Sequence, residues 1–290
     1  MFLVTGATGS LGRRVVHLLR EREESVRAFV RLNARYGDLA DRGADIFVGD
    51  LENERDIARS LRGIRYVIST HGAGRDATAL MYRANIELIE QSKAQDVEHF
   101  TFVSVLGADR GYEDAPTFKA KRVVESYLQG SGVNYTILRP SGFANNLLPL
   151  AERFRDTGFY LLIGDPENRS SIISTDDLAR ITADSARNEA ARQQVLAVGG
   201  PEIIQRGDIP KIFSRIYQRE PFVVNIPLPL FDGARGLLGA FNPDAERDLG
   251  TLRTLLANEF FCTSEQVAQV EAIYGLKLES LEQFLRRYSG

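Results

Sequence analysis

Short apolar runs alternate with helix-like segments along the first half of this chain. Six runs have the length and the turn residues at both ends that are typical of buried parallel strands. These runs are Phe2–Thr5, Val26–Val30, Asp45–Val48, Tyr66–Thr70, Phe100–Val105 and Tyr135–Leu138. Helical periodicity lies between them at Leu11–Arg22, Asp56–Leu61, Ala77–Gln95 and Lys119–Gln129. The repeated strand–helix–strand order predicts an α/β fold with a doubly wound parallel sheet.

The regular alternation of strand-like and helix-like segments changes after Pro140. Helical patterns follow at Leu147–Arg155, Thr175–Arg187, Asp208–Arg219 and Ala245–Asn258, and short strand-like runs at Leu161–Ile163, Val195–Val198 and Phe222–Val224. We therefore expect residues 1–140 to form the doubly wound domain. Residues 141–290 are expected to form a smaller α/β lobe, with some segments returning to the main domain.

The composition argues against several classes of function. The 290 residues carry a net charge of −3 and no basic stripe, which argues against a nucleic-acid partner. Cys262 is the only cysteine and follows two phenylalanines, so it is expected to be a buried structural thiol, and the three histidines are dispersed. We expect no metal site. The sequence shows no targeting segment and no apolar run of about 18 to 20 residues, so we expect a cytoplasmic protein without a membrane span.

A glycine-rich loop directly follows the first expected strand. Residues Thr5–Gly12 read TGATGSLG, with glycines at 6, 9 and 12. In this context Gly6 permits a tight turn, Gly9 lets a pyrophosphate approach the backbone, and Gly12 allows close packing of helix and strand. The helix N-terminus then meets the phosphates, and Thr8, Ser10 and Leu11 are expected to supply further loop contacts.

The residues after the second strand bear on which dinucleotide binds. An acidic residue near this place usually holds the ribose 2′-hydroxyl of NAD, whereas Arg31 stands here, with Arg35 four residues later. A guanidinium suits a 2′-phosphate, so we expect NADP(H) rather than NAD(H). The alternative for Arg31 is a solvated strand end. Asp50, after the third strand, either binds the adenine amino group or caps the helix near Asn53.

The ordered motifs resemble those of the NmrA-like atypical short-chain dehydrogenases/reductases. The resemblance spans nearly the whole chain. It rests on the glycine loop, Val30-Arg31, Gly49-Asp50-Leu51, Phe102-Val103-Ser104, Lys121, Tyr135–Pro140, Gly142-Phe143, Ser174–Ala179 and Gly199–Glu202. The group includes quinone reductases, isoflavone-type reductases, photosystem-assembly proteins and non-catalytic redox sensors. The resemblance implies an NAD(P)-binding Rossmann domain. It defines the fold and the cofactor better than it defines the reaction.

The resemblance also implies site residues. Lys121 would hold the nicotinamide ribose and Ser104 would lie beside the nicotinamide, which makes these two the catalytic candidates. Phe143 and Asn146 are the substrate candidates, although aromatic residues here, such as Tyr160, also suit the core of the second lobe. The cofactor-binding candidates, besides Lys121, are Gly6, Thr8, Gly9, Ser10, Leu11, Gly12, Arg31, Arg35, Asp50, Leu51, Thr70, His71, Gly72, Pro140 and Phe143.

One family residue is missing. Most short-chain reductases use Tyr-x-x-x-Lys, whereas Thr117 stands four residues before Lys121. Three interpretations follow. In the first, the chain reduces a quinone-like or other aromatic or carbonyl acceptor, with protons from water, Lys121 or Tyr112. In the second, it senses NADP(H) and signals to a protein partner. In the third, it is an assembly factor. We favour the NADPH-dependent oxidoreductase, with a small-molecule acceptor. The sequence leaves the oligomeric state open.

Overall fold

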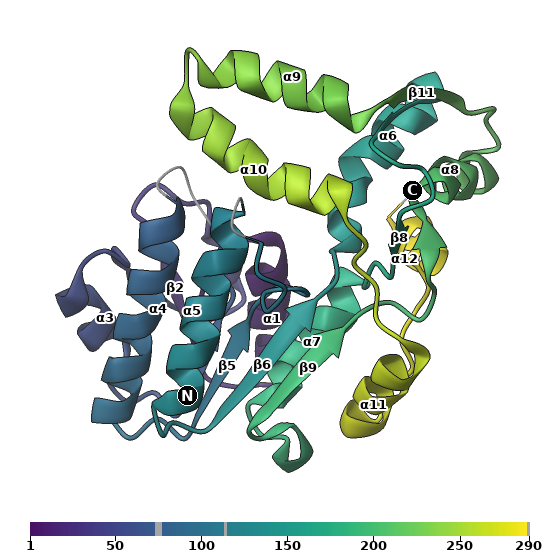
Figure 1. Cartoon of the computed structure of the whole chain (residues 1–290). Helices are drawn as coiled ribbons and strands as arrows, with labels where there is room; N and C mark the ends of the chain where they lie inside the picture. The colour runs from purple at the N-terminus through teal and green to yellow at the C-terminus, as the bar shows by residue number, and fades with distance from the viewer. Residues whose placement is uncertain (73–76, 113–114, 289–290) are drawn as a thin grey trace.

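A seven-stranded parallel sheet organises this computed structural model, which describes residues 1–72, 77–112 and 115–288 (Figure 1). Every neighbouring pair of strands in it is parallel. The strand order is β3 (Asp45–Val48), β2 (Val26–Val30), β1 (Phe2–Thr5), β4 (Tyr66–Ser69), β5 (His99–Val103), β6 (Tyr135–Pro140) and β9 (Gln194–Val198). The predicted doubly wound α/β fold is confirmed. The order reverses between β1 and β4, where open sheets of this kind bind ligands.

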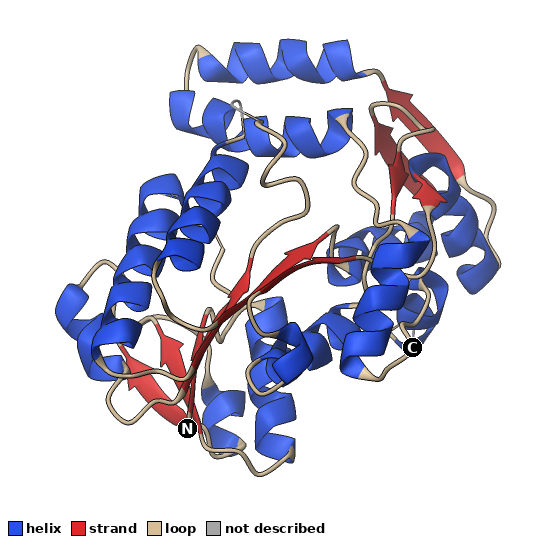
Figure 2. Cartoon of the chain, turned by 60° about the horizontal axis from the view of Figure 1, so that its bottom comes forward, coloured by secondary structure: helices blue, strands red, loops and turns tan. Residues whose placement is uncertain are grey.

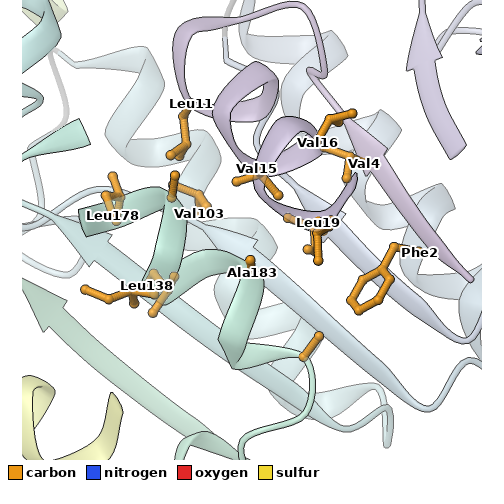
Figure 3. Close-up of a cluster of buried hydrophobic side chains, with 14 of the residues drawn as sticks. Phe2, Val4, Leu11, Val15, Val16, Leu19, Val103, Leu138, Leu178 and Ala183 are labelled. Atoms are coloured by element: carbon orange, nitrogen blue, oxygen red, sulfur yellow. The ribbon is translucent and has the colours of Figure 1, made fainter. Parts of the chain in front are cut away.

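Helices cover both faces of the sheet (Figure 2). One face carries α1 (Ser10–Glu21), α2 (Gly37–Asp41), α7 (Thr175–Ser185) and α11 (Ser264–Tyr274), and the other carries α3 (Glu54–Ser60), α4 (Ala77–Ala94) and α5 (Pro116–Gly130). Successive strand residues point to opposite faces, so Phe2 and Val4 pack under α1 while Leu3 packs under the other layer. Figure 3 shows the first of these cores, with Val103 of β5 between Leu178 of α7 and Val15 of α1.

The second half builds a smaller core of its own. It is centred on Phe154, Phe213 and Phe284, which are fully buried. Its short strands form two pairs, parallel β7–β11 and antiparallel β8–β10. Besides α7, β9, α11 and two helices within residues 228–257, the elements of this half are η1 (Ala144–Leu147), α6 (Leu148–Thr157), β7 (Phe159–Ile163), β8 (Arg169–Ser170), η2 (Glu189–Ala191), β10 (Ile204–Gln205), η3 (Arg206–Asp208), α8 (Ile209–Tyr217), β11 (Phe222–Ile226) and α12 (Leu281–Arg287).

The chain end is tied back to the first helix through one carboxylate. Asp176, in the first turn of α7, accepts hydrogen bonds from Arg14 Nε at 2.7 Å, Arg287 Nη2 at 2.7 Å and the Tyr288 hydroxyl at 3.0 Å. Ser174 caps α7, its hydroxyl accepting from the Asp177 amide. The helical pattern expected from Thr175 is therefore confirmed, and Asp176 links α1, α7 and the segment after α12.

A helical hairpin projects from the second half. It consists of α9 (Leu228–Gly239) and α10 (Pro243–Ala257), and α10 runs across α5 (Figure 1). The helical patterns predicted from the sequence do not include α9, which contains a proline of the kind that breaks a helix interior. Pro229 instead lies in the first turn of α9, where a missing amide hydrogen costs no helical hydrogen bond. No helix among the described residues is both long and apolar enough to cross a bilayer.

The second core gives a stability prediction. Phe284→Ala removes a fully buried ring from the core that also contains Phe154 and Phe213, and we expect the free energy of unfolding to fall by about 3–5 kcal/mol. Leu32→Ala is the control, because Leu32 is 77% exposed and its truncation leaves no cavity. Urea unfolding of both variants measures the difference; equal losses would contradict the assignment of this core.

Candidate functional site

The glycine loop between β1 and α1 is held against the end of β4. Gly6 has a φ of +70°, a conformation that suits glycine, and a Cβ there would lie 2.7 Å from the backbone of His71. A Cβ on Gly12 would overlap the Gly6 carbonyl oxygen and approach Thr70 Oγ1. Thr70 Oγ1 donates to the Thr5 carbonyl oxygen at 2.8 Å. The loop, the start of α1 and the segment after β4 therefore form one close-packed unit.

The N-terminus of α1 is open to an anion. Gly9 is the N-cap residue, and no side chain among the described residues caps this helix end. The first turn contains no acidic residue. The amide groups of this turn lack helical partners and carry the positive end of the helix dipole, which favours a phosphate group.

Arg13 connects the glycine loop to the segment after β2. Its guanidinium pairs with Asp38 of α2 and donates to the carbonyl oxygens of Arg35, at 2.7 Å, and Thr8, at 3.5 Å. Arg31 and Arg35 are exposed on the same segment. The structure thus places three arginines on α1 and the segment after β2, next to the glycine loop. Arg13 is not among the site residues expected from the sequence, although its position directly after the third glycine is a usable signal.

Asp50 lies exposed at the end of β3. Its Oδ1 accepts from the Glu52 amide at 2.9 Å, whereas Asn53 is the residue that caps α3, accepting from the Arg55 amide at 3.0 Å. The alternative role of Asp50 as a helix cap is therefore wrong. Leu51 packs partly against the core on the α3 face.

His71 is buried in a closed network of hydrogen bonds behind the loop. Asn85 Nδ2 donates to His71 Nε2 at 3.0 Å, so the neutral ring carries its hydrogen on Nδ1, which lies 2.9 Å from Thr5 Oγ1. Ser69 Oγ donates to Asn85 Oδ1 at 2.6 Å. Burial, with a smaller contribution from the Lys121 charge, lowers the pKa of His71 to about 3. His71 is thus a neutral structural side chain that fixes Thr70 to Gly72.

Lys121 on α5 reaches the end of β5. Its Nζ donates to the Val103 carbonyl oxygen at 2.7 Å and lies 4.6 Å from the centroid of the Phe102 ring. Burial lowers the pKa of Lys121 to about 8, while the Glu125 charge acts in the opposite direction. The next residue of the strand end, Ser104, is buried, and its hydroxyl has no hydrogen-bond partner among the described residues.

The carboxylate one turn beyond Lys121 is held by another group. Arg139 of β6 donates to Glu125 from Nε at 3.0 Å and from Nη2 at 2.6 Å, and Nη1 donates to Asp109 at 2.5 Å. Glu125 is buried, so this bidentate pair compensates its charge. The ammonium group of Lys121 therefore hydrogen-bonds to a backbone carbonyl, and its pKa is set mainly by burial.

The position of the missing tyrosine is in contact with α10. Thr117 Oγ1 accepts a hydrogen bond from Thr251 Oγ1 of α10 at 3.3 Å. Tyr112, the other tyrosine considered for proton transfer, packs its ring against Phe118 at 5.3 Å and Phe260 at 6.0 Å. It belongs to the apolar cluster that also contains the buried Cys262. Tyr112 is a packing residue of that cluster.

The expected substrate residues separate into two groups. Phe143 is half-buried after β6, and its carbonyl accepts from the exposed Asn146 at 3.0 Å. These two remain next to the carboxyl end of the sheet, together with Pro140. Tyr160 is instead 5% exposed and packs its edge on Phe213 in the second core. The interpretation of Tyr160 as a core residue is confirmed.

These features fit a dinucleotide. The carboxyl ends of β1, β4, β5 and β6 are adjacent in the sheet, so the glycine loop, Thr70–Gly72, Ser104 and Pro140–Phe143 share one edge. The uncapped start of α1 suits a pyrophosphate. The buried hydroxyl of Ser104, which has no partner within the part of the chain that the structure describes, suits a polar group of the nicotinamide half.

A family model described as NAD(P)H-binding matches residues 6–189, which is more than half of the chain. The chain belongs to this family. The predicted resemblance to the NmrA-like atypical short-chain reductases is confirmed.

Similar proteins differ in what they do. The Photosystem II assembly factor Ycf39 of Cyanophora paradoxa is 28% identical over 99% of this chain and 91% of its own. The NAD(P)H azoreductase of Xenophilus azovorans is 29% identical over 79% of this chain and 78% of its own. The structure of an NADPH-dependent quinone oxidoreductase from Escherichia coli with NADPH covers all of both chains with a TM-score of 0.81, at 19% identity. That last likeness supports the fold.

The His71 network gives a pH prediction. The pKa of His71 is about 3 in the folded protein and about 6.5 in the unfolded chain. Its contribution to stability is therefore complete above pH 6.5 and declines as the pH falls, by about 1.4 kcal/mol per pH unit. We expect His71→Gln to have a flatter dependence of unfolding free energy on pH between 6.5 and 5 than the native chain. Parallel curves from chemical denaturation would contradict a buried neutral His71.

Proposed function

We propose that this protein is an NADPH-dependent oxidoreductase that reduces a flat conjugated acceptor, such as a quinone-like or other aromatic carbonyl compound. One observation carries the proposal. The ammonium group of Lys121 is buried at the carboxyl end of β5, where it donates to the Val103 carbonyl oxygen, and the hydroxyl of the next residue, Ser104, has no partner among the described residues. A buried cation with a pKa of about 8 is a proton donor suited to neutral pH.

The division of labour follows from these residues. Bound NADPH supplies a hydride, and Lys121 holds at Nζ the proton that completes a two-electron reduction. The Ser104 hydroxyl orients the reacting groups, and the half-buried ring of Phe143 offers apolar surface to a flat acceptor. Thr117 takes no part, because an aliphatic hydroxyl is too weak an acid to replace a phenol near neutral pH.

The preference for NADPH rests on the arginines between the glycine loop and α2. Arg31 and Arg35 are exposed on the segment after β2, and Arg13 is oriented towards it by its bond to the Arg35 carbonyl. These guanidinium groups favour a ribose 2′-phosphate. Asp38, the nearby carboxylate, is already paired with Arg13 and His17.

A second candidate function is an NADP(H)-sensing regulatory protein or an assembly factor. Two observations favour it. Thr117 stands in place of the family tyrosine and is engaged by Thr251, and the assembly factor Ycf39 is similar over 99% of this chain, including the second half. In this case the cofactor is bound and held, and a protein partner reads its presence.

Turnover tests the first candidate. We expect NADPH oxidation, followed at the nicotinamide absorbance band, with at least one member of a panel of quinones and other aromatic acceptors. Lys121→Met keeps the volume and removes the charge, so kcat is expected to fall about 100-fold or more while the chain stays folded. Since Lys121 donates only when protonated, kcat of the native protein is expected to decline above about pH 8.

Lys93→Ala, an exposed lysine near the end of α4, is the matched control and should leave turnover unchanged. NADPH binding by calorimetry separates the two candidates. Tight binding without turnover on any acceptor would sink the reductase proposal and favour the sensor or assembly factor. Turnover that survives in Lys121→Met would exclude Lys121 as the proton donor.

Arg31→Ala tests the cofactor preference. Loss of a charged hydrogen bond to the 2′-phosphate is expected to raise the Kd for NADPH about tenfold or more and to leave the Kd for NADH unchanged. Arg62→Ala, an exposed arginine after α3, serves as the control for net charge. An equal loss for both dinucleotides would place Arg31 outside the 2′-phosphate site.

A further inference from the structure

In the hairpin α9–α10, the charged side chains of α9 face inwards and its large apolar side chains face outwards. The charged side chains of α9 face α10: Asp232 accepts from Arg253 Nε at 2.7 Å and Nη2 at 3.0 Å, and Arg235 donates to the Glu246 carbonyl oxygen at 3.0 Å. The opposite face is apolar and exposed, with Leu230 at 66% and Leu237 at 71%. A helix that lies on a protein in water usually presents the reverse pattern.

The exposed positions form a stripe with helical spacing. Leu230, Ala234, Leu237 and Phe241 follow one another at intervals of four, three and four residues, which is the spacing of a seam between packed helices. The last of them lies just after the helix, in a turn in which the Phe241 amide donates to the Leu238 carbonyl oxygen. The stripe is about 16 Å long. We call these four positions the outer stripe of α9.

Two glycines of α9 lack an explanation within the chain. A Cβ added to Gly233 or Gly236 would meet no described atom within 4 Å, and neither residue has a positive φ. Each costs the helix about 1 kcal/mol relative to alanine. Small residues next to larger apolar ones let the backbone of a second helix approach closely.

We propose that the outer stripe of α9 packs against the same stripe of a second copy of this chain, so that the protein is a dimer with a two-fold axis across α9. In a two-fold interface the same surface patch of both copies meets, so a charged side chain in the patch would lie opposite a like charge. The outer stripe contains none. Its two leucines and the Phe241 ring expose about 400 Å² of apolar surface, roughly half of the 800 Å² that each partner of a stable complex buries, which suits a weak dimer.

The hairpin is less suited to a lipid surface. Residues 228–257 contain no lysine, and their acidic residues, Asp232, Asp244, Glu246 and Asp248, outnumber the three arginines. Interfacial membrane helices are typically rich in basic residues on their polar face. The proposal concerns a surface separate from the cofactor site and does not depend on the proposed reaction.

Sedimentation velocity of the full chain tests the dimer. We expect the native protein to sediment as a dimer that dissociates on dilution, and Leu237→Glu and Phe241→Glu to sediment as monomers. Ile203→Glu, which charges an exposed apolar residue after β9, should remain dimeric. Unchanged NADPH binding in all variants shows that they are folded.

Cross-linking supplies a second readout. Ala234→Cys lies in the middle of the stripe and is expected to give a disulfide-linked dimer on mild oxidation, while the native chain gives none because Cys262 is 1% exposed. A native protein that is monomeric at every concentration overturns the proposal, as does a dimer that both glutamate variants leave intact. A monomer that binds phosphatidylcholine vesicles through α9 would assign the stripe to lipid instead and also overturns it.

Discussion

The close approach of Gly6 to His71 is the contact on which the candidate site depends. The backbone of His71 leaves no room for a side chain on Gly6, and the Thr70 hydroxyl ties the end of β4 to Thr5 of β1. The position of His71 is in turn fixed by Asn85, which receives a hydrogen bond from Ser69. Three secondary-structure elements thereby set the position of the loop that leads into the uncapped N-terminus of α1. A preorganised loop of this kind binds an anion without first having to be ordered.

The chemistry of the site follows from burial more than from paired charges. Glu125 is the carboxylate one turn from Lys121, and Arg139 engages it through two nitrogen atoms. The Lys121 ammonium keeps a carbonyl oxygen and an aromatic ring as neighbours. Desolvation then lowers its pKa towards neutrality, whereas a direct ion pair with Glu125 would raise it. Because Arg139 of β6 engages Glu125, Lys121 has no direct carboxylate partner, and its pKa stays lowered by burial.

Sequence patterns predicted the sheet and the glycine loop well, because both depend on local rules. Buried parallel strands appear as short apolar runs, and a glycine with positive φ between a strand and a helix has few alternatives. Arg13, Asn85 and the packing role of Tyr112 escaped prediction, since each is defined by partners distant in sequence. The helix α9 escaped for a local reason: Pro229 indicates a break in a helix interior but a favourable start in the first turn.

The missing tyrosine and the hairpin are connected in the structure. Four residues before Lys121, most short-chain reductases place a phenol that moves a proton, whereas this chain places a threonine that accepts a hydrogen bond from Thr251 of α10. The position therefore serves to anchor α10 on α5. With α10 fixed there, and with the charges of α9 turned towards α10, the apolar stripe of α9 is left facing away from the domain. One substitution at the site is thus linked, through two packed helices, to the surface that this protein offers to a second copy.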